Sequence, residues 1–84
     1  MAGDSLVERL MKQAERHVGA GSPARIHILV GALSNISPVS LRRQFTRTTV
    51  GSPLAGVELV FHVGGDPLSP DALAVRVVEV DVAA

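Results

Sequence analysis

The chain has 84 residues, which is enough for one small domain spanning residues 1–84, whose core supplies only a few kcal/mol of net stability. Hydrophobic residues make up 46% of it, a share typical of globular proteins and too high for a disordered chain. Eight basic residues balance eight acidic ones, which argues against a general affinity for nucleic acid. The absence of cysteine excludes disulfides and thiolate metal sites.

The N-terminal segment carries charges throughout, whereas a signal peptide needs an unbroken apolar centre. No apolar run approaches the roughly 20 residues of a membrane span. We therefore expect a cytoplasmic protein that contacts neither membranes nor nucleic acid.

The first predicted element is a helix near the N-terminus, capped by Asp4 or Ser5 and ended by the segment from Gly19 to Pro23. Its apolar residues recur at helical spacing and predict one face against a core. They are Leu6, Val7, Leu10, Met11, Ala14 and Val18. A strand follows, in which Ile26, Ile28 and Val30 alternate with His27 and Leu29.

A turn-rich loop from Gly31 to Ser37 precedes the second predicted helix. Ser37 is a good cap and Pro38 suits the first helical position, where its missing N–H costs nothing. The residues from Thr48 to Pro53 are expected to end this helix. Alternating apolar residues then predict a second strand over residues 57–63.

The third predicted strand covers residues 73–82, after a loop from Gly64 to Asp71. Its apolar residues change phase at Val77 and Val78, which indicates either a β-bulge or a strand covered on both faces. The element order α-β-α-β-β predicts an α+β fold, with two helices packed on one face of a three-stranded mixed sheet. The strand-helix-strand unit implies a right-handed crossover if its strands are parallel.

A series of segments resembles the HypA/HybF family of hydrogenase nickel-incorporation proteins. The segments are Val30-Gly31-Ala32-Leu33-Ser34, then Ile36, Pro38, Leu41 and Phe45, then Gly51-Ser52-Pro53-Leu54-Ala55-Gly56-Val57-Glu58-Leu59. Ser5-Leu6 is similar to the opening of the family's first helix, and the last predicted strand to the family's last strand. The resemblance implies the fold of the family's nickel-binding domain and a role in hydrogenase maturation.

Two features of the family are missing from this sequence. The family binds nickel through an N-terminal Met-His pair, but Ala2 occupies the second position here and offers no imidazole. The family's zinc module, with paired CxxC motifs, is replaced by a short loop around Gly64–Pro67, and a chain without cysteine cannot supply its thiolates. The resemblance therefore implies a degenerate short form, with no bound cofactor expected and no zinc.

Histidines and arginines are the remaining candidates for sites. His27 and His62 lie on the strand face opposite the apolar rows and would meet if their strands were neighbours, either as half-exposed sheet residues or as metal ligands. The position of His17 near the end of the first helix is explained by a favourable interaction with the helix C-terminus.

Two further groups are candidates for partner binding. The alternative interpretations are a solvated helix face for the first group and a plain turn for the second. They are Arg42, Arg43 and Arg47 on the second helix, and Ser34 and Asn35 in the loop before it.

No catalytic motif such as GxSxG, GxxxxGK or HExxH is present, so we do not expect an enzyme. The leading hypothesis is an accessory protein that docks onto a hydrogenase subunit or a maturation factor. One alternative is a nickel metallochaperone that uses other ligands, drawn from Met1, Asp4, His27 and His62. A second is a structural subunit that forms a homodimer through an exposed sheet edge.

Overall fold

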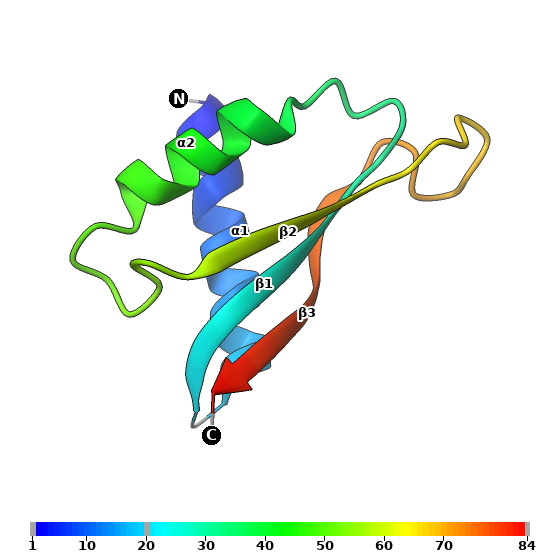
Figure 1. The fold of residues 1–84 in the computed structure, drawn as a ribbon. Coiled ribbons are helices and arrows are strands. Elements are labelled where there is room, and N and C mark those ends of the chain that lie inside the picture. Colours follow the sequence, from blue (N-terminus) through cyan, green and yellow to red (C-terminus); the bar gives the residue numbers. More distant parts are fainter. Residues whose placement is uncertain (1, 20, 84) are drawn as a thin grey trace.

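The computed structural model describes residues 2–19 and 21–83, with side chains from residue 6 onward. The elements follow the order α1 (Ala2–Val18), β1 (Ser22–Val30), α2 (Pro38–Thr48), β2 (Glu58–Val63) and β3 (Val75–Ala83). This is the predicted α-β-α-β-β order, and both helices lie on one face of a three-stranded mixed sheet (Figure 1). The α+β prediction is confirmed.

The strand order is β2-β1-β3, so β1 is the central strand. β1 pairs with β2 in parallel, from Arg25 opposite Glu58 to Val30 opposite Val63. It pairs with β3 antiparallel, from Ser22 opposite Ala83 to Val30 opposite Val75. The parallel pair requires the chain to cross over between β1 and β2, and α2 lies in that crossover.

The core lies between the helices and one face of the sheet. Side chains at alternate positions of β1 point toward α1, as the strand period requires, and they are fully or almost fully buried. The buried cluster consists of Val7, Leu10, Ala14, Ile26, Ile28, Val30, Leu41, Phe45, Leu54, Leu59 and Val77. The apolar stripe predicted for the first helix therefore faces this core, and so do Leu41 and Phe45 of α2.

A β-bulge at Val78 explains the change of phase in the third strand. His27 pairs with Glu79, whereas the next residue, Ile28, pairs with Val77, so Val78 has no partner in β1. The extra residue keeps Val77 and Val80 on the core side of the sheet although two residues separate them. Of the two interpretations of the phase change, the bulge is the one observed.

The start of α1 differs from the prediction. The helix begins at Ala2, so Asp4 and Ser5 lie within it and not at its cap. Asp4 therefore lies in the first turn of the helix, where an acidic residue is favourable because the positive end of the helix dipole lies there. The cap of α2 is as predicted, since the Ser37 hydroxyl accepts a hydrogen bond from the Ser40 N–H at 3.4 Å and Pro38 follows it.

The loop after β1 is fastened to the segment before β3. The N–H groups of Gly31 and Leu33 donate to the carbonyl oxygens of Ala74 and Ala72, at 2.8 and 2.7 Å. A Cβ at Gly31 would overlap the carbonyl oxygens of Asp71 and Ala72, so only glycine fits this close approach. β3 itself begins at Val75, two residues later than predicted.

Among the described residues, no helix is long and apolar enough to cross a membrane.

Candidate functional site

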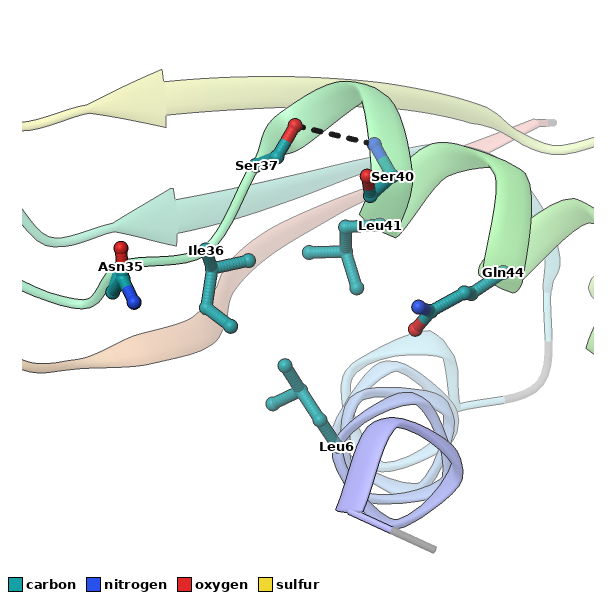
Figure 2. Close-up of a pocket in the computed structure, with 7 residues that line it drawn as sticks. All are labelled: Leu6, Asn35, Ile36, Ser37, Ser40, Leu41 and Gln44. Carbon is teal, nitrogen blue, oxygen red and sulfur yellow. Dashed lines mark hydrogen bonds between the residues drawn. The ribbon is translucent and has the colours of Figure 1, made fainter.

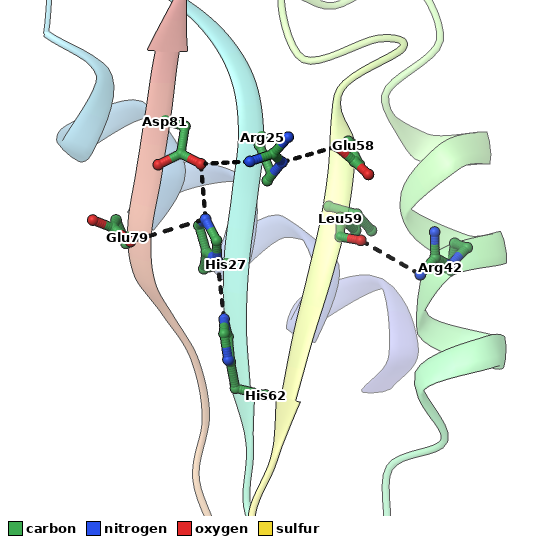
Figure 3. A network of polar contacts seen from close by, with 8 residues as sticks. All are labelled: Arg25, His27, Arg42, Glu58, Leu59, His62, Glu79 and Asp81. Carbon is green, nitrogen blue, oxygen red and sulfur yellow. Dashed lines mark hydrogen bonds and ion pairs between the residues drawn. The ribbon is translucent and has the colours of Figure 1, made fainter.

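Charged and imidazole side chains collect on the face of the sheet that the helices leave uncovered. Each strand contributes alternate residues to this face, because the other alternate residues enter the core. Figure 3 shows the group in front of the sheet, with α1 behind the sheet and α2 beside β2. We call it the outer-face cluster; its members are Arg25, His27, Glu58, His62, Glu79 and Asp81.

The two histidines of this cluster are in contact. His27 pairs with Val60 and His62 pairs with Leu29, so the histidines occupy diagonal positions on neighbouring parallel strands. Nδ1 of His27 lies 2.9 Å from Nε2 of His62, and the rings stack with centroids 5.2 Å apart and planes 25° apart. The proximity predicted for this pair is confirmed.

The carboxylates of β3 lie on the other side of His27. Its Nε2 is 2.9 Å from Oδ2 of Asp81 and 3.9 Å from Oε2 of Glu79. The imidazole of His27 is 15% exposed, whereas the two carboxylate side chains are 40% and 67% exposed. Neutral His27 can donate from Nε2 to Asp81 while its Nδ1 accepts from His62, so one imidazole links a carboxylate to a second imidazole.

Arg25 completes the cluster on the same face. Its Nε donates to Glu58 at 2.9 Å, and its Nη1 donates to the same Asp81 oxygen at 3.3 Å. The hydrogen bond from His27, assisted by the charges of His27 and Arg25, lowers the pKa of Asp81 below its ordinary value, although partial burial opposes this shift. The hydrogen bond to Glu58, with the charge of that carboxylate, raises the pKa of Arg25.

The metal-ligand candidates from the sequence do not all meet. Met1 and the side chain of Asp4 lie outside the described residues, and the backbone of Asp4 belongs to α1, on the other face of the sheet from the histidine pair. Sequence reasoning missed Glu79 and Asp81, which share a group of potential ligand atoms with His27. The signal for them was the phase change, because the bulge sets which face both residues occupy.

The third histidine does not join the cluster. Nδ1 of His17 lies 2.7 Å from the carbonyl oxygen of Gln13, in the last turn of α1. This agrees with the predicted interaction between His17 and the C-terminal end of the helix.

The three arginines of α2 do not form one patch. Arg42 turns toward β2, where its Nη2 donates to the carbonyl oxygen of Leu59 at 3.4 Å and its guanidinium lies 5.2 Å from the centre of the Phe61 ring. Arg43 and Arg47 are exposed and stand one helical turn apart on the same face. Only these two present their charges together.

The loop between β1 and α2 borders several hollows. Asn35, whose φ of 57° is in the left-handed region, lines a pocket of about 350 Å³ that extends between α2 and Leu6 of α1 (Figure 2). Ser34 is held by a hydrogen bond from its hydroxyl to the carbonyl oxygen of Gly31 at 2.9 Å. Ser34 lines two further hollows, of about 390 and 330 Å³, and Ile36 lines all three.

Comparison with known proteins finds a likeness to a hydrogenase maturation factor. The chain is 37% identical over 60 residues to the hydrogenase maturation factor HypA of Ignicoccus hospitalis. The matched segment covers 71% of this chain but 41% of that protein, so the chain spans less than half of its relative's length. No family model matches the chain, and no solved structure matches it significantly. The chain is thus similar to part of a hydrogenase maturation factor.

Proposed function

We propose that this protein is an accessory factor in the maturation or assembly of nickel-iron hydrogenase, and that it acts by docking onto a hydrogenase subunit or another maturation factor. The likeness to a hydrogenase maturation factor supports a role in hydrogenase maturation. The proposal is of a binding protein and not of an enzyme. In this proposal the fold provides a surface that binds a partner protein.

The docking surface is the loop 31–37 together with the exposed face of α2. This loop is the observation that carries the proposal, because three hollows border it and backbone hydrogen bonds fix it to the segment 72–74. Leu33, at 53% exposure, offers an apolar side chain at the loop. Arg43 and Arg47 add two positive charges nearby, which suit an acidic partner surface. Arg42 is left out of the surface because it packs against β2.

The metal centres of the HypA/HybF family do not fit this chain. Ala2 offers no imidazole at the position where the family's nickel motif has histidine, and the sequence contains no cysteine for a zinc module. The alternative of a nickel metallochaperone draws its ligands from Met1, Asp4, His27 and His62, but Asp4 belongs to α1, which the sheet separates from the two histidines, so these residues do not form one ligand set. These observations favour docking over metal delivery.

Self-association through a sheet edge is the other alternative. β3 is an edge strand, as this alternative requires. However, its ladder is interrupted by the bulge at Val78, and Arg76, Glu79 and Asp81 place charges along it. Bulges and charges are the devices by which edge strands avoid pairing with another copy. We therefore favour a partner of a different kind.

The test is binding to purified components. The tag-free protein is mixed in turn with each hydrogenase subunit and each maturation factor of the same organism, and complexes are measured by calorimetry and light scattering. We expect a one-to-one complex with one of them. The variants Leu33→Asp and Arg43→Glu/Arg47→Glu are expected to weaken it at least about tenfold, because they remove the apolar contact or reverse the charge.

Two matched variants serve as controls. Leu68→Asp changes a leucine that is 91% exposed in a different loop, and Arg16→Glu reverses a charge on α1. Both should bind as the unaltered protein does. If no component binds, the proposed function is wrong; if the controls weaken the complex as much as the loop variants do, the docking surface lies elsewhere.

A further inference from the structure

We propose that His27, Glu79 and Asp81 form a binding site for a divalent transition-metal ion of the Zn²⁺ class, with His62 as the residue that positions His27. The site lies on the outer face of the sheet and shares no residue with the docking surface. Metal binding at this site and partner binding at the docking surface can therefore be tested separately.

The ligand atoms already lie near the spacing that such an ion needs. One nitrogen of His27 and one oxygen from each carboxylate all lie within 4.8 Å of one another. Metal–ligand bonds of about 2.0–2.2 Å in tetrahedral geometry place neighbouring ligand atoms about 3.3 Å apart. The observed separations from Nε2 of His27, 2.9 Å to Asp81 and 3.9 Å to Glu79, lie on either side of this value. To surround an ion, the Asp81 oxygen has to move slightly away from Nε2 of His27 and the Glu79 oxygen slightly toward it.

The backbone holds these residues in register. His27 is directly opposite Glu79, and Arg25 is directly opposite Asp81, so the two carboxylates flank the imidazole across one strand pair. Glu79, Val80 and Asp81 follow the bulge, which places both carboxylates on the outer face while Val80 enters the core. Strand pairing therefore preorganises the ligand set before an ion arrives.

The charges of the outer-face cluster favour a cation. Glu58, Glu79 and Asp81 carry three negative charges against the single positive charge of Arg25 while the histidines are neutral. Arg25 is shared between Glu58 and Asp81, at 2.9 and 3.3 Å, so it does not neutralise both β3 carboxylates. Asp81 also has a second oxygen through which it can reach an ion.

His62 supplies the hydrogen bond that a metal-binding imidazole needs at its other nitrogen. When Nε2 of His27 binds an ion, its proton resides on Nδ1 and is donated to Nε2 of His62, 2.9 Å away. Both neutral imidazoles change tautomer on binding: His27 gives up the proton on Nε2 and carries one on Nδ1, while His62 gives up the proton on Nε2 and carries one on Nδ1, so the number of bound protons does not change. A neutral imidazole with two carboxylates suits Zn²⁺ and its neighbours, whereas Mg²⁺ prefers oxygen ligands alone.

The test is a zinc titration of tag-free protein, with a chromophoric chelator as competitor. We expect saturable one-to-one binding that an excess of Mg²⁺ does not displace. His27→Gln should abolish it. Asp81→Asn and Glu79→Gln should each weaken it at least about tenfold, and His62→Gln about 10–100-fold, as for other residues that orient a ligand.

The matched controls are His17→Gln and Asp66→Asn, which alter a histidine and an aspartate outside the cluster and should leave affinity unchanged. Nitrogen NMR of the imidazoles in the unaltered protein gives a readout that does not depend on any variant folding. Zinc should shift Nε2 of His27 and leave a proton on Nδ1. No saturable binding, binding that survives His27→Gln, displacement by Mg²⁺, or a metal shift at His17 in place of His27 would each overturn the proposal.

Discussion

At the scale of single residues, Gly31 is a position at which the fold tolerates little change. A Cβ there would overlap two carbonyl oxygens of the segment 71–72, so Gly31→Ala has to force two backbone segments apart. We expect the free energy of unfolding to fall by about 1–3 kcal/mol, as for other overpacked sites. Urea denaturation followed by circular dichroism measures it.

Gly65→Ala is the matched control for this prediction. A Cβ at Gly65 would meet no atom within 4 Å, so the stability should change by less than about 0.5 kcal/mol. If Gly31→Ala proved as stable as Gly65→Ala, the contact between the loop after β1 and the segment before β3 would be too loose to fix the docking surface.

The same scale shows how far single residues could be placed from the sequence. The contact between His27 and His62 was predictable, because it needs only that two strands be parallel neighbours and that side chains alternate. Asp81 and Glu79 were not placed beside His27, because their face depends on the bulge and their partner depends on the strand order. The turn of Arg42 toward Phe61 depends on how α2 sits against β2, which no local pattern reports.

At the scale of elements, the bulge in β3 leads to a prediction about deletion. Val78 has no partner in β1, so its removal leaves Val77 in the core, Glu79 on the outer face and Val80 in the core. We expect the protein lacking Val78 to fold cooperatively, with the same pairs between β1 and β3. Hydrogen exchange of the β1 amides, with thermal unfolding, measures this.

Deletion of Val80 is the control, because it removes a core residue and turns Asp81 toward the core. Burial of a carboxylate, added to the loss of the valine, should destabilise the protein by at least about 2 kcal/mol. Equal damage from the two deletions would mean that the twist introduced by the bulge, and not only the phase of the side chains, is essential to the sheet.

Elements with local signals were predictable. Ser37 and Pro38 fixed the start of α2, because capping and the proline φ depend on neighbouring residues alone. The predicted start of α1 was wrong because acidic residues are favourable both at a helix cap and within the first turn, so Asp4 alone does not fix where the helix begins. The predicted start of β3 was too early because the N–H groups of Ala72 and Ala74 donate within local turns, to the carbonyl oxygens of Ser69 and Asp71, and so do not form a regular ladder.

At the scale of the whole molecule, apolar periodicity predicted two helices on one face of a mixed sheet but not the strand order. Periodicity reports which face of a strand is buried and does not report its neighbours. The order β2-β1-β3 places β1 in the centre and brings β2 and β3 to its two sides. The outer-face cluster exists only in this order, because His27 must touch His62 on one side and Asp81 on the other.

Because the domain is small, the loss of one core side chain removes a large part of its free energy of unfolding. At about 0.05–0.15 kcal/mol per residue, a chain of this length has a free energy of unfolding of about 4–13 kcal/mol. Leu10 of α1 is fully buried, and Leu10→Ala should cost about 2–5 kcal/mol. Since about 1 kcal/mol shifts the thermal midpoint of so small a domain by about 4–8 °C, a fall of about 10 °C or more is expected by calorimetry.

Leu68→Ala makes the same change of side chain at a position that is 91% exposed, and it should leave the midpoint within a few degrees. A small effect of Leu10→Ala would mean that α1 is not needed to close the core. In that case the pocket between Leu6 and α2 could open without loss of the sheet. A large effect ties the shape of the docking surface to the packing of α1, because the same helix that closes the core also forms one wall of that pocket.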